Sequence, residues 1–227
     1  MFSALISNSI ELIQCTYMVS IQKGADMRLL SYVVTHDTGF SPNPFWGYCT
    51  LANCKPSIRR TAKIGDWIVG LSPRGSGHRL VFAMKVDEIL GYASYYRDGR
   101  FANKKPDYTR GDVVWKVGDN IYEPLQYGEF RQLQSMHSNG EEENPETKAH
   151  DLRGVNVLIA TKFHYFGASG PELPRRLEEL KVGRGHKSRF SRETIGDFLK
   201  FISSYPQGVS APPMKWPSSD MSWKQKI

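Results

Sequence analysis

The chain has 227 residues, of which 40% are hydrophobic and 12% aromatic, so composition excludes global disorder and predicts one domain with appendages. Its net charge of +7 favours a polyanionic partner without identifying one. Three cysteines are too few for a disulfide framework, and no apolar run is long enough to cross a membrane. We therefore expect no membrane partner and a place in the reducing cytoplasm.

The two ends of the chain differ from its middle. Residues 1–26 are mildly apolar but lack the basic start of a signal peptide, and patterned sequence begins near Met27. After Tyr205 the sequence becomes proline-rich and loses its pattern. We predict an N-terminal extension over 1–26, either foreign to the native protein or loosely docked, a domain over 27–205, and a proline-rich C-terminal tail over 206–227.

Short apolar runs predict strands in the first half of the domain. LLSYVVTH at 29–36 and DWIVGLS at 66–72 have the length and composition of buried strands. PRGSGH at 73–78 contains the proline and glycine residues typical of a hairpin turn. RLVFAMKVDEIL at 79–90 then predicts a longer strand.

The second half mixes helix and strand. GYASYYRDGRF from residue 91 predicts a short helix or turn, and the acidic segment 138–151 a surface loop. VNVLIATKFHYF at 155–166 predicts a strand, and SRETIGDFLKFISSY at 191–205 an amphipathic helix capped by Ser191. Together these elements predict an α+β fold built on a small curled mixed sheet or a barrel, flanked by short helices.

Several ordered segments point to a family. They are VVTHDTGFSPNPFWGYCTLANCKPSIRRTAKIGDWIVG from residue 33, RLVFAMKVDEIL, RFANKKP, GDNIY and VLIATKFHYFG. Over roughly residues 28–190 the chain resembles the nucleotide modification associated domain family. The resemblance implies a PUA-like β-barrel of the PUA, EVE, YTH and ASCH group, which holds a nucleobase, often a modified one, in a pocket. It also implies an association with DNA modification in bacteria and phages, although a fold does not by itself fix an activity.

The loop around FWGY is the predicted base site. Prolines and a glycine restrict its backbone, so its three aromatic rings are expected to form a rigid wall on which a base stacks. The alternative is that these rings plug one end of a barrel. An asparagine before the loop, an asparagine in GDNIY that could instead form an Asx-turn, and a tyrosine in FHYFG extend the site. The predicted base-binding residues are Asn43, Phe45, Trp46, Tyr48, Asn120 and Tyr165.

Three basic groups are predicted to follow a phosphate backbone. Each of them has solvated surface charge as its alternative explanation. The predicted phosphate-binding residues are Arg59, Arg60, Lys104, Lys105, Arg184, Lys187 and Arg189.

An enzyme is the alternative to a binding module. His36, Asp37 and Cys49 would then supply the acid, base or nucleophile, whereas a structural role for Asp37 in its turn explains it equally well. Cys49 and Cys54 lack the spacing of a redox pair or a zinc knuckle, and we predict no metal site.

The sequence thus favours a nucleic-acid-binding module that recognises a modified base without covalent chemistry. DNA is the expected partner ahead of RNA, and no cofactor is predicted, since no nucleotide-triphosphate or dinucleotide motif occurs. An enzyme of base modification and a protein-interaction module remain the alternatives.

Overall fold

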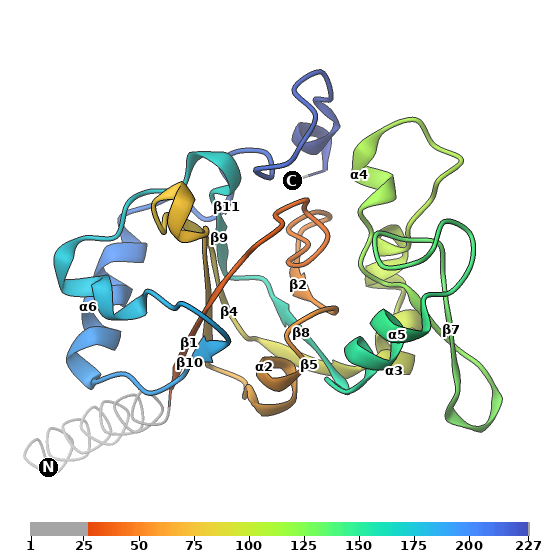
Figure 1. Cartoon of the computed structure of the whole chain (residues 1–227), viewed down its shortest axis with the longest axis horizontal. Helices are drawn as coiled ribbons and strands as arrows, with labels where there is room; N and C mark the ends of the chain where they lie inside the picture. Colours follow the sequence, from red (N-terminus) through yellow and green to blue (C-terminus); the bar gives the residue numbers. More distant parts are fainter. Residues whose placement is uncertain (1–26, 227) are drawn as a thin grey trace, which may run out of the picture.

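The computed structural model describes residues 27–226, so the predicted N-terminal extension lies outside the described residues. Its larger sheet is mixed, with strand order β10-β1-β3-β4-β9-β11 (Figure 1). β1 runs parallel to β3 and β9 parallel to β11, and the other pairs are antiparallel. The strands are β1 (Leu29–Val33), β3 (Trp67–Leu71), β4 (Leu80–Lys85), β9 (Phe163–Tyr165), β10 (His186–Lys187) and β11 (Gly208–Val209).

A smaller antiparallel sheet has the order β2-β8-β5, and β6 and β7 form a separate hairpin. Their bounds are β2 (Cys49–Leu51), β5 (Glu88–Gly91), β8 (Asn156–Ala160), β6 (Tyr122–Pro124) and β7 (Phe130–Gln132). The described strands do not close into a barrel. The predicted α+β class is therefore confirmed, and the curled mixed sheet describes it better than the barrel does.

Two runs predicted as single strands each divide between the sheets. The run 79–90 becomes β4 and β5, and the run 155–166 becomes β8 and β9. Asp87 lies at the first break and its Oδ2 accepts hydrogen bonds from Thr161 at the second break, 2.7 Å from both the backbone nitrogen and Oγ1. The two breaks therefore face each other, because β4 pairs with β9 and β5 with β8.

The strands are apolar on both faces because helices cover both sheets. Side chains such as Leu30 and Ile68 pack between the two sheets, whereas Val69 packs on the outer face against α6 and its neighbours (Figure 1). The α-helices are α2 (Pro56–Thr61), α3 (Tyr92–Arg97), α4 (Val113–Lys116), α5 (Pro145–Leu152) and α6 (Arg192–Ser203). The short 3-10 helices cover Arg74–Ser76, Gly99–Lys104, Gln126–Gly128, Gly167–Ser169, Arg175–Leu180 and Ser222–Gln225.

Local capping explains where two helices begin. α6 forms as predicted, with Ser191 Oγ accepting from the Thr194 nitrogen at 3.0 Å. The segment 138–151 was predicted to be a surface loop, but α5 occupies its second half. Asn144 caps α5 by accepting from two backbone nitrogens, and Pro145 sets the backbone of the first turn. None of the described helices is long and apolar enough to span a bilayer.

The predicted C-terminal tail packs on the domain. β11 adds to the edge of the larger sheet, and the Trp216 ring lies 5.5 Å from that of Phe45. The Lys215 nitrogen donates to the Asp37 carbonyl at 2.9 Å, and the Lys226 carbonyl accepts from the Trp46 nitrogen at 2.7 Å. The segment 206–226 therefore covers the loop that follows β1.

Candidate active site

Cys54 lies in the short connection between the end of β2 and the start of α2. Its φ is 57° and that of Lys55 is 40°, so two consecutive residues with Cβ atoms adopt the left-handed conformation. Such residues cost about 1–3 kcal/mol each and persist only where surrounding contacts impose them. The bend brings the half-buried Cys54 thiol out of the apolar layer that holds Cys49.

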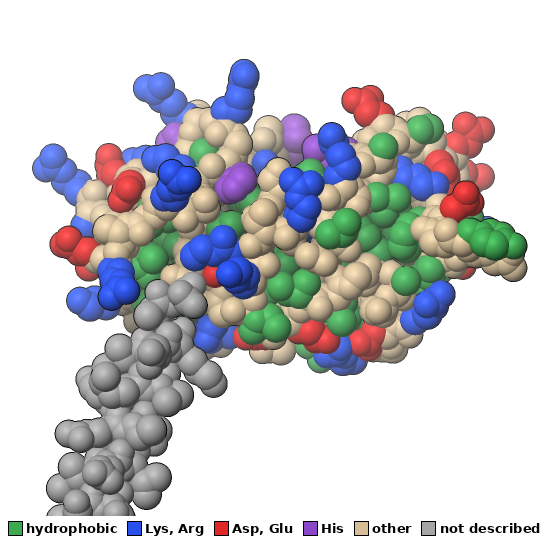
Figure 2. All heavy atoms as spheres, turned by 90° about the horizontal axis from the view of Figure 1, so that it is seen from below, with side chains coloured by type: hydrophobic (Ala, Val, Ile, Leu, Met, Phe, Trp, Pro, Cys, Tyr) green, Lys and Arg blue, Asp and Glu red, His purple; other side chains and the backbone are tan. Residues whose placement is uncertain are grey.

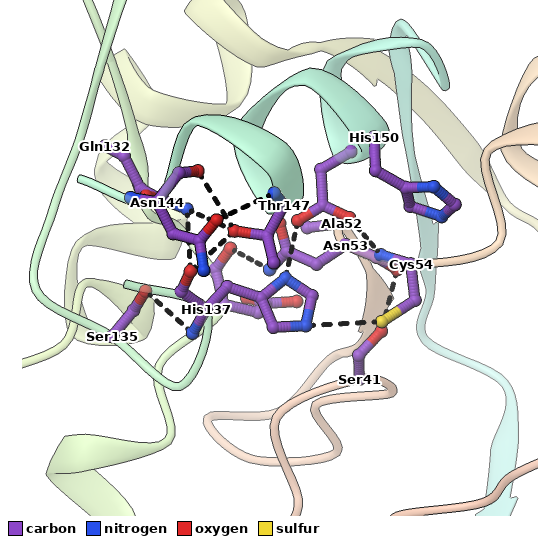
Figure 3. A network of polar contacts seen from close by, with 12 residues as sticks. Ser41, Ala52, Asn53, Cys54, Gln132, Ser135, His137, Asn144, Thr147 and His150 are labelled. Carbon is purple, nitrogen blue, oxygen red and sulfur yellow. Dashed lines mark hydrogen bonds and ion pairs between the residues drawn. The ribbon is translucent and has the colours of Figure 1, made fainter. Parts of the chain in front are cut away.

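A histidine and a carboxylate line up behind this thiol. The Cys54 Sγ lies 3.5 Å from the His137 Nε2, and the His137 Nδ1 lies 2.7 Å from the Asp151 Oδ2. Figure 3 shows the imidazole from the loop after β7 with one nitrogen directed at the sulfur. The thiol, the imidazole and the carboxylate thus lie in the spatial order that cysteine-dependent catalysis requires.

Asp151, at the C-terminal end of α5, is fully buried and held from several sides. Its Oδ1 accepts from the Cys54 nitrogen at 2.7 Å, and its Oδ2 also accepts from the Tyr122 hydroxyl at 2.9 Å. These bonds fix the carboxylate and tie it to the backbone of Cys54.

Arg59 of α2 holds the two parts of the site together. Its guanidinium is buried and donates from Nε to the Cys54 carbonyl at 2.7 Å and from Nη2 to the Asp151 carbonyl at 2.5 Å. Gly154 leaves the space for it, since an added Cβ there would lie 2.3 Å from the guanidinium carbon. Arg59 is therefore a positioning residue for the thiol and the carboxylate.

The His137 imidazole is fixed by packing and by its own backbone. Its ring lies 4.8 Å from that of Phe40. Its carbonyl accepts from the Thr147 Oγ1 at 2.6 Å, as Figure 3 shows. Burial by itself lowers the pKa of His137, but the hydrogen bonds with Asp151 and Cys54 outweigh it and raise the pKa to about 10. The imidazole therefore carries a proton at neutral pH.

The same three side chains are the candidate metal ligands of the described residues, because their donor atoms lie within 4.8 Å of one another. In tetrahedral ligation the ligands surround the ion, so the carboxylate and the thiolate would both have to lie beside the imidazole nitrogen that binds it. Here Asp151 faces Nδ1 and Cys54 faces Nε2, on opposite sides of the ring. The spatial order thiol, imidazole, carboxylate is that of a proton relay. The three residues therefore fit a proton relay better than they fit a metal site.

The thiol and the imidazole open onto a cavity of about 850 Å³, within the usual range for small-molecule sites. Its wall is formed by the end of β1, the loop after it, the start of α2, β10 and the C-terminal segment. On the α5 side Cys54 and His137 also border a second depression of about 650 Å³. Figure 2 views the molecule from below Figure 1, where histidines reach the surface among Lys and Arg side chains.

Comparison with protein families matches residues 26–220 to nucleotide modification associated domain 2. The chain belongs to the nucleotide modification associated domain 2 family. Comparison with curated proteins and with solved structures gives no match. The predicted family is thereby confirmed, and the match extends past residue 205 into the segment that packs on the domain.

In this nucleotide modification associated domain the predicted base-binding residues do not line the cavity. Asn43, Phe45, Asn120 and Tyr165 are at most 2% exposed. The polar groups of Asn43, Asn120 and Tyr165 are hydrogen-bonded within the protein, to the Val117 carbonyl, the Tyr95 carbonyl and the Asp37 carboxylate. Trp46 and Tyr48 are half-buried, and Trp46 packs at 4.4 Å against Trp115. The aromatic loop packs on the core, where Phe45, Trp46 and Tyr48 contact one hydrophobic cluster.

The predicted phosphate-binding residues differ in their burial. Arg59 and Lys104 are fully buried; Lys104 donates to Asn43 and Tyr48 carbonyls, and burial lowers its pKa to about 8. Lys105 stacks on Tyr96 at 3.8 Å. The exposed residues Arg60, Arg184, Lys187 and Arg189 flank segments that contribute Ser57, Gly185 and His186 to the cavity wall.

The alternative catalytic set His36, Asp37 and Cys49 does not converge. Asp37 is buried, accepts from the Tyr165 hydroxyl and the Met214 nitrogen, and has its pKa raised by burial. Cys49 lies in the core, where burial raises its pKa, and His36 faces Lys215 at the cavity wall. Only His36 of the three reaches the cavity.

Sequence reasoning missed His137 and Asp151 and chose the other cysteine. Asp151 is the last residue of the acidic segment 138–151 that was interpreted as a surface loop, and His137 directly precedes that segment. Asn144-Pro145 followed by an acidic residue is a helix-start signal and could have placed Asp151 on a helix. Nothing in the spacing of 83 residues between Cys54 and His137 indicates that they meet.

Proposed function

We propose that this domain is a cysteine-dependent enzyme of nucleotide modification, with Cys54 as the nucleophile, His137 as the acid and base, and Asp151 as the residue that orients the imidazole. The observation that carries the proposal is the Cys54–His137–Asp151 alignment at the wall of a cavity large enough for a small molecule.

The arrangement suits acyl transfer. With the thiol proton already on His137, the sulfur attacks the carbonyl carbon of an amide or ester. The leaving group departs with that proton, which leaves a thioester on Cys54. Water or an amine then attacks the thioester carbon and gives a proton to His137, which returns it to the departing sulfur. The raised pKa of His137 favours the imidazolium, which is the form that stabilises a thiolate.

The substrate class follows from the family and from charge. The family description concerns nucleotides, and the net charge of +7 favours a polyanion. We propose nucleic acid, DNA ahead of RNA, as the carrier of the modified nucleotide, with Arg60, Arg184, Lys187 and Arg189 near its backbone.

A second candidate is recognition of a modified base without covalent chemistry. It is favoured by the size of the cavity, whose wall includes the side chains of Tyr32 and Phe40. The two candidates share the cavity and differ in whether Cys54 reacts.

The test is the rate at which iodoacetamide alkylates Cys54, read by peptide mass spectrometry at pH 7. The wild-type chain is compared with His137→Gln and with Asp151→Asn. We expect both variants to react on the order of 10²-fold more slowly, the lower end of what a positioned acid or base contributes.

His150→Gln is the matched control, since His150 lines the same cavity but is directed away from the sulfur in Figure 3. Equal alkylation of wild type and His137→Gln would contradict the enzyme. Affinity for a modified oligonucleotide that survives in Cys54→Ala, together with such equality, would favour recognition alone.

A further inference from the structure

The wall of the cavity beside Cys54 carries basic side chains. The cavity is lined by His36, His137, His150 and His186, four of the six histidines of the chain, and by Lys55 and Lys215. No Asp or Glu occurs among the described residues that line it. A concave surface of this kind concentrates anions, because its field is not cancelled by carboxylates within the wall.

The two lysines have no acidic partner in the part of the chain that the structure describes. Lys55 follows the nucleophile directly, and its Nζ lies 4.7 Å from the centre of the Tyr32 ring. Lys215 comes from the C-terminal segment and donates to the His36 Nδ1. Each ammonium group has further N–H donors to offer, since it carries three.

Tyr32 adds an unused donor. Its side chain lines the cavity and is 1% exposed, yet its hydroxyl has no hydrogen-bond partner among the described residues. A buried hydroxyl left unpaired costs about 1–3 kcal/mol. Burial also raises the pKa of Tyr32 well above its usual value, so the hydroxyl remains a donor at neutral pH.

We propose that the cavity binds the phosphate group of a nucleotide, with Lys55 and Lys215 as its cationic partners and the Tyr32 hydroxyl as a further donor. The cavity volume of about 850 Å³ leaves room for a nucleoside beside the phosphate. This rests on the proposed function only in taking the cavity as the substrate site, and it requires no reaction of Cys54. The phosphate could belong to a free nucleotide or to a nucleic-acid strand.

Calorimetric titration of the full chain carrying Cys54→Ala tests the proposal without interference from thiol chemistry. The probes are the four deoxynucleoside monophosphates, the same four deoxynucleosides, and a short single-stranded oligodeoxynucleotide. We expect at least one monophosphate, or the oligonucleotide, to bind about 10-fold more tightly than the deoxynucleosides. Whichever of the two binds identifies the source of the phosphate.

Lys215→Gln should weaken phosphate-dependent binding about 10-fold, whereas Lys200→Gln on α6, away from the cavity, should not. Tyr32→Phe should weaken it in the same way without lowering the melting temperature, because the hydroxyl has no internal partner to lose. Equal binding of phosphorylated and unphosphorylated probes, no binding of any probe, or equal effects of Lys215→Gln and Lys200→Gln would overturn the proposal. Loss of phosphate binding with normal Cys54 alkylation would contradict phosphate binding and leave the proposed enzymatic role intact. Normal phosphate binding with Cys54 alkylation that does not depend on His137 would contradict only the enzymatic role.

Discussion

Two cysteines separated by the four residues TLAN have opposite environments. Cys49 lies in β2 between the two sheets and is fully buried, next to the Met84 sulfur at 3.9 Å. Cys54 lies past the strand end, half-buried, with an imidazole facing its sulfur. A strand fixes one cysteine as an apolar side chain, and a left-handed bend turns the other towards a cavity.

The surroundings of the two regions differ in the same sense. Lys104 donates to the Tyr48 carbonyl in the aromatic loop before Cys49, and burial lowers the pKa of Lys104 to about 8. At the bend, Arg59 donates to the Cys54 carbonyl. The Cys54 thiol faces His137, whose pKa is raised to about 10 by hydrogen bonds with Asp151 and Cys54. Polar groups in the first region hold a core together, whereas those in the second surround the half-buried thiol of Cys54 at the cavity. Composition therefore does not distinguish a structural region from a reactive one.

The largest expected effect is the contrast in reactivity between the two thiols. Cys49 should react with iodoacetamide only when the domain opens, which for a domain stable by about 5 kcal/mol limits its rate at least 10³-fold relative to an accessible thiol. Peptide mass spectrometry over a time course gives both rates in one sample. Similar rates in native buffer would show that the contrast in burial does not hold in solution.

The next effect concerns the aromatic loop. Phe45→Ala should lower the free energy of unfolding by about 3–5 kcal/mol, because Phe45 is fully buried against Trp216 and its neighbours. Met136→Ala, at a cavity residue that is 47% exposed, should change it by no more than about 0.5 kcal/mol. Urea unfolding followed by tryptophan fluorescence measures both, and a small loss for Phe45→Ala would reopen the base-stacking role of the loop.

A smaller effect tests the part of Arg59. Gly154→Ala should displace its guanidinium, cost about 1–3 kcal/mol as overpacking does, and slow the alkylation of Cys54. Gly183→Ala is the matched control, since an added Cβ there meets no atom within 4 Å. If Gly154→Ala lost stability but kept full thiol reactivity, Arg59 would support the fold without positioning the nucleophile.

The smallest effect is a pair of opposed pH dependences. Folding raises the pKa of His137 from its usual 6.5 to about 10, so its stabilisation is complete below pH 6.5 and is lost as pH rises towards 10. Folding lowers the pKa of Lys104 from 10.5 to about 8, so stability is gained as pH rises from 8 to 10.5. Each slope is at most about 1.4 kcal/mol per pH unit, and between pH 8 and 10 the two cancel.

Urea unfolding at several pH values measures these slopes in variants that each lack one group. Relative to wild type, His137→Gln should show stability rising between pH 8 and 10, and Lys104→Met should show it falling. Parallel curves for the two variants would contradict the opposed shifts, whatever the absolute stabilities.

The sequence by itself determined the family, the mixed α+β class and most of the strands and helices, because these depend on local apolar runs, caps and an ordered series of motifs. Ser191 as the cap of α6 and the strand at DWIVGLS are examples. Tertiary structure decided the breaks at Asp87 and Thr161, which exist because two runs pair with each other across two sheets.

Only the tertiary structure decided the candidate site. Cys54 and Asp151 are separated by 97 residues and Cys54 and His137 by 83, and they meet because α5 and the loop after β7 pack beside the end of β2. No periodicity in the sequence encodes such long-range proximity. The same packing placed Phe45 against Trp216 and Trp46 against Trp115, because burying apolar rings is favourable.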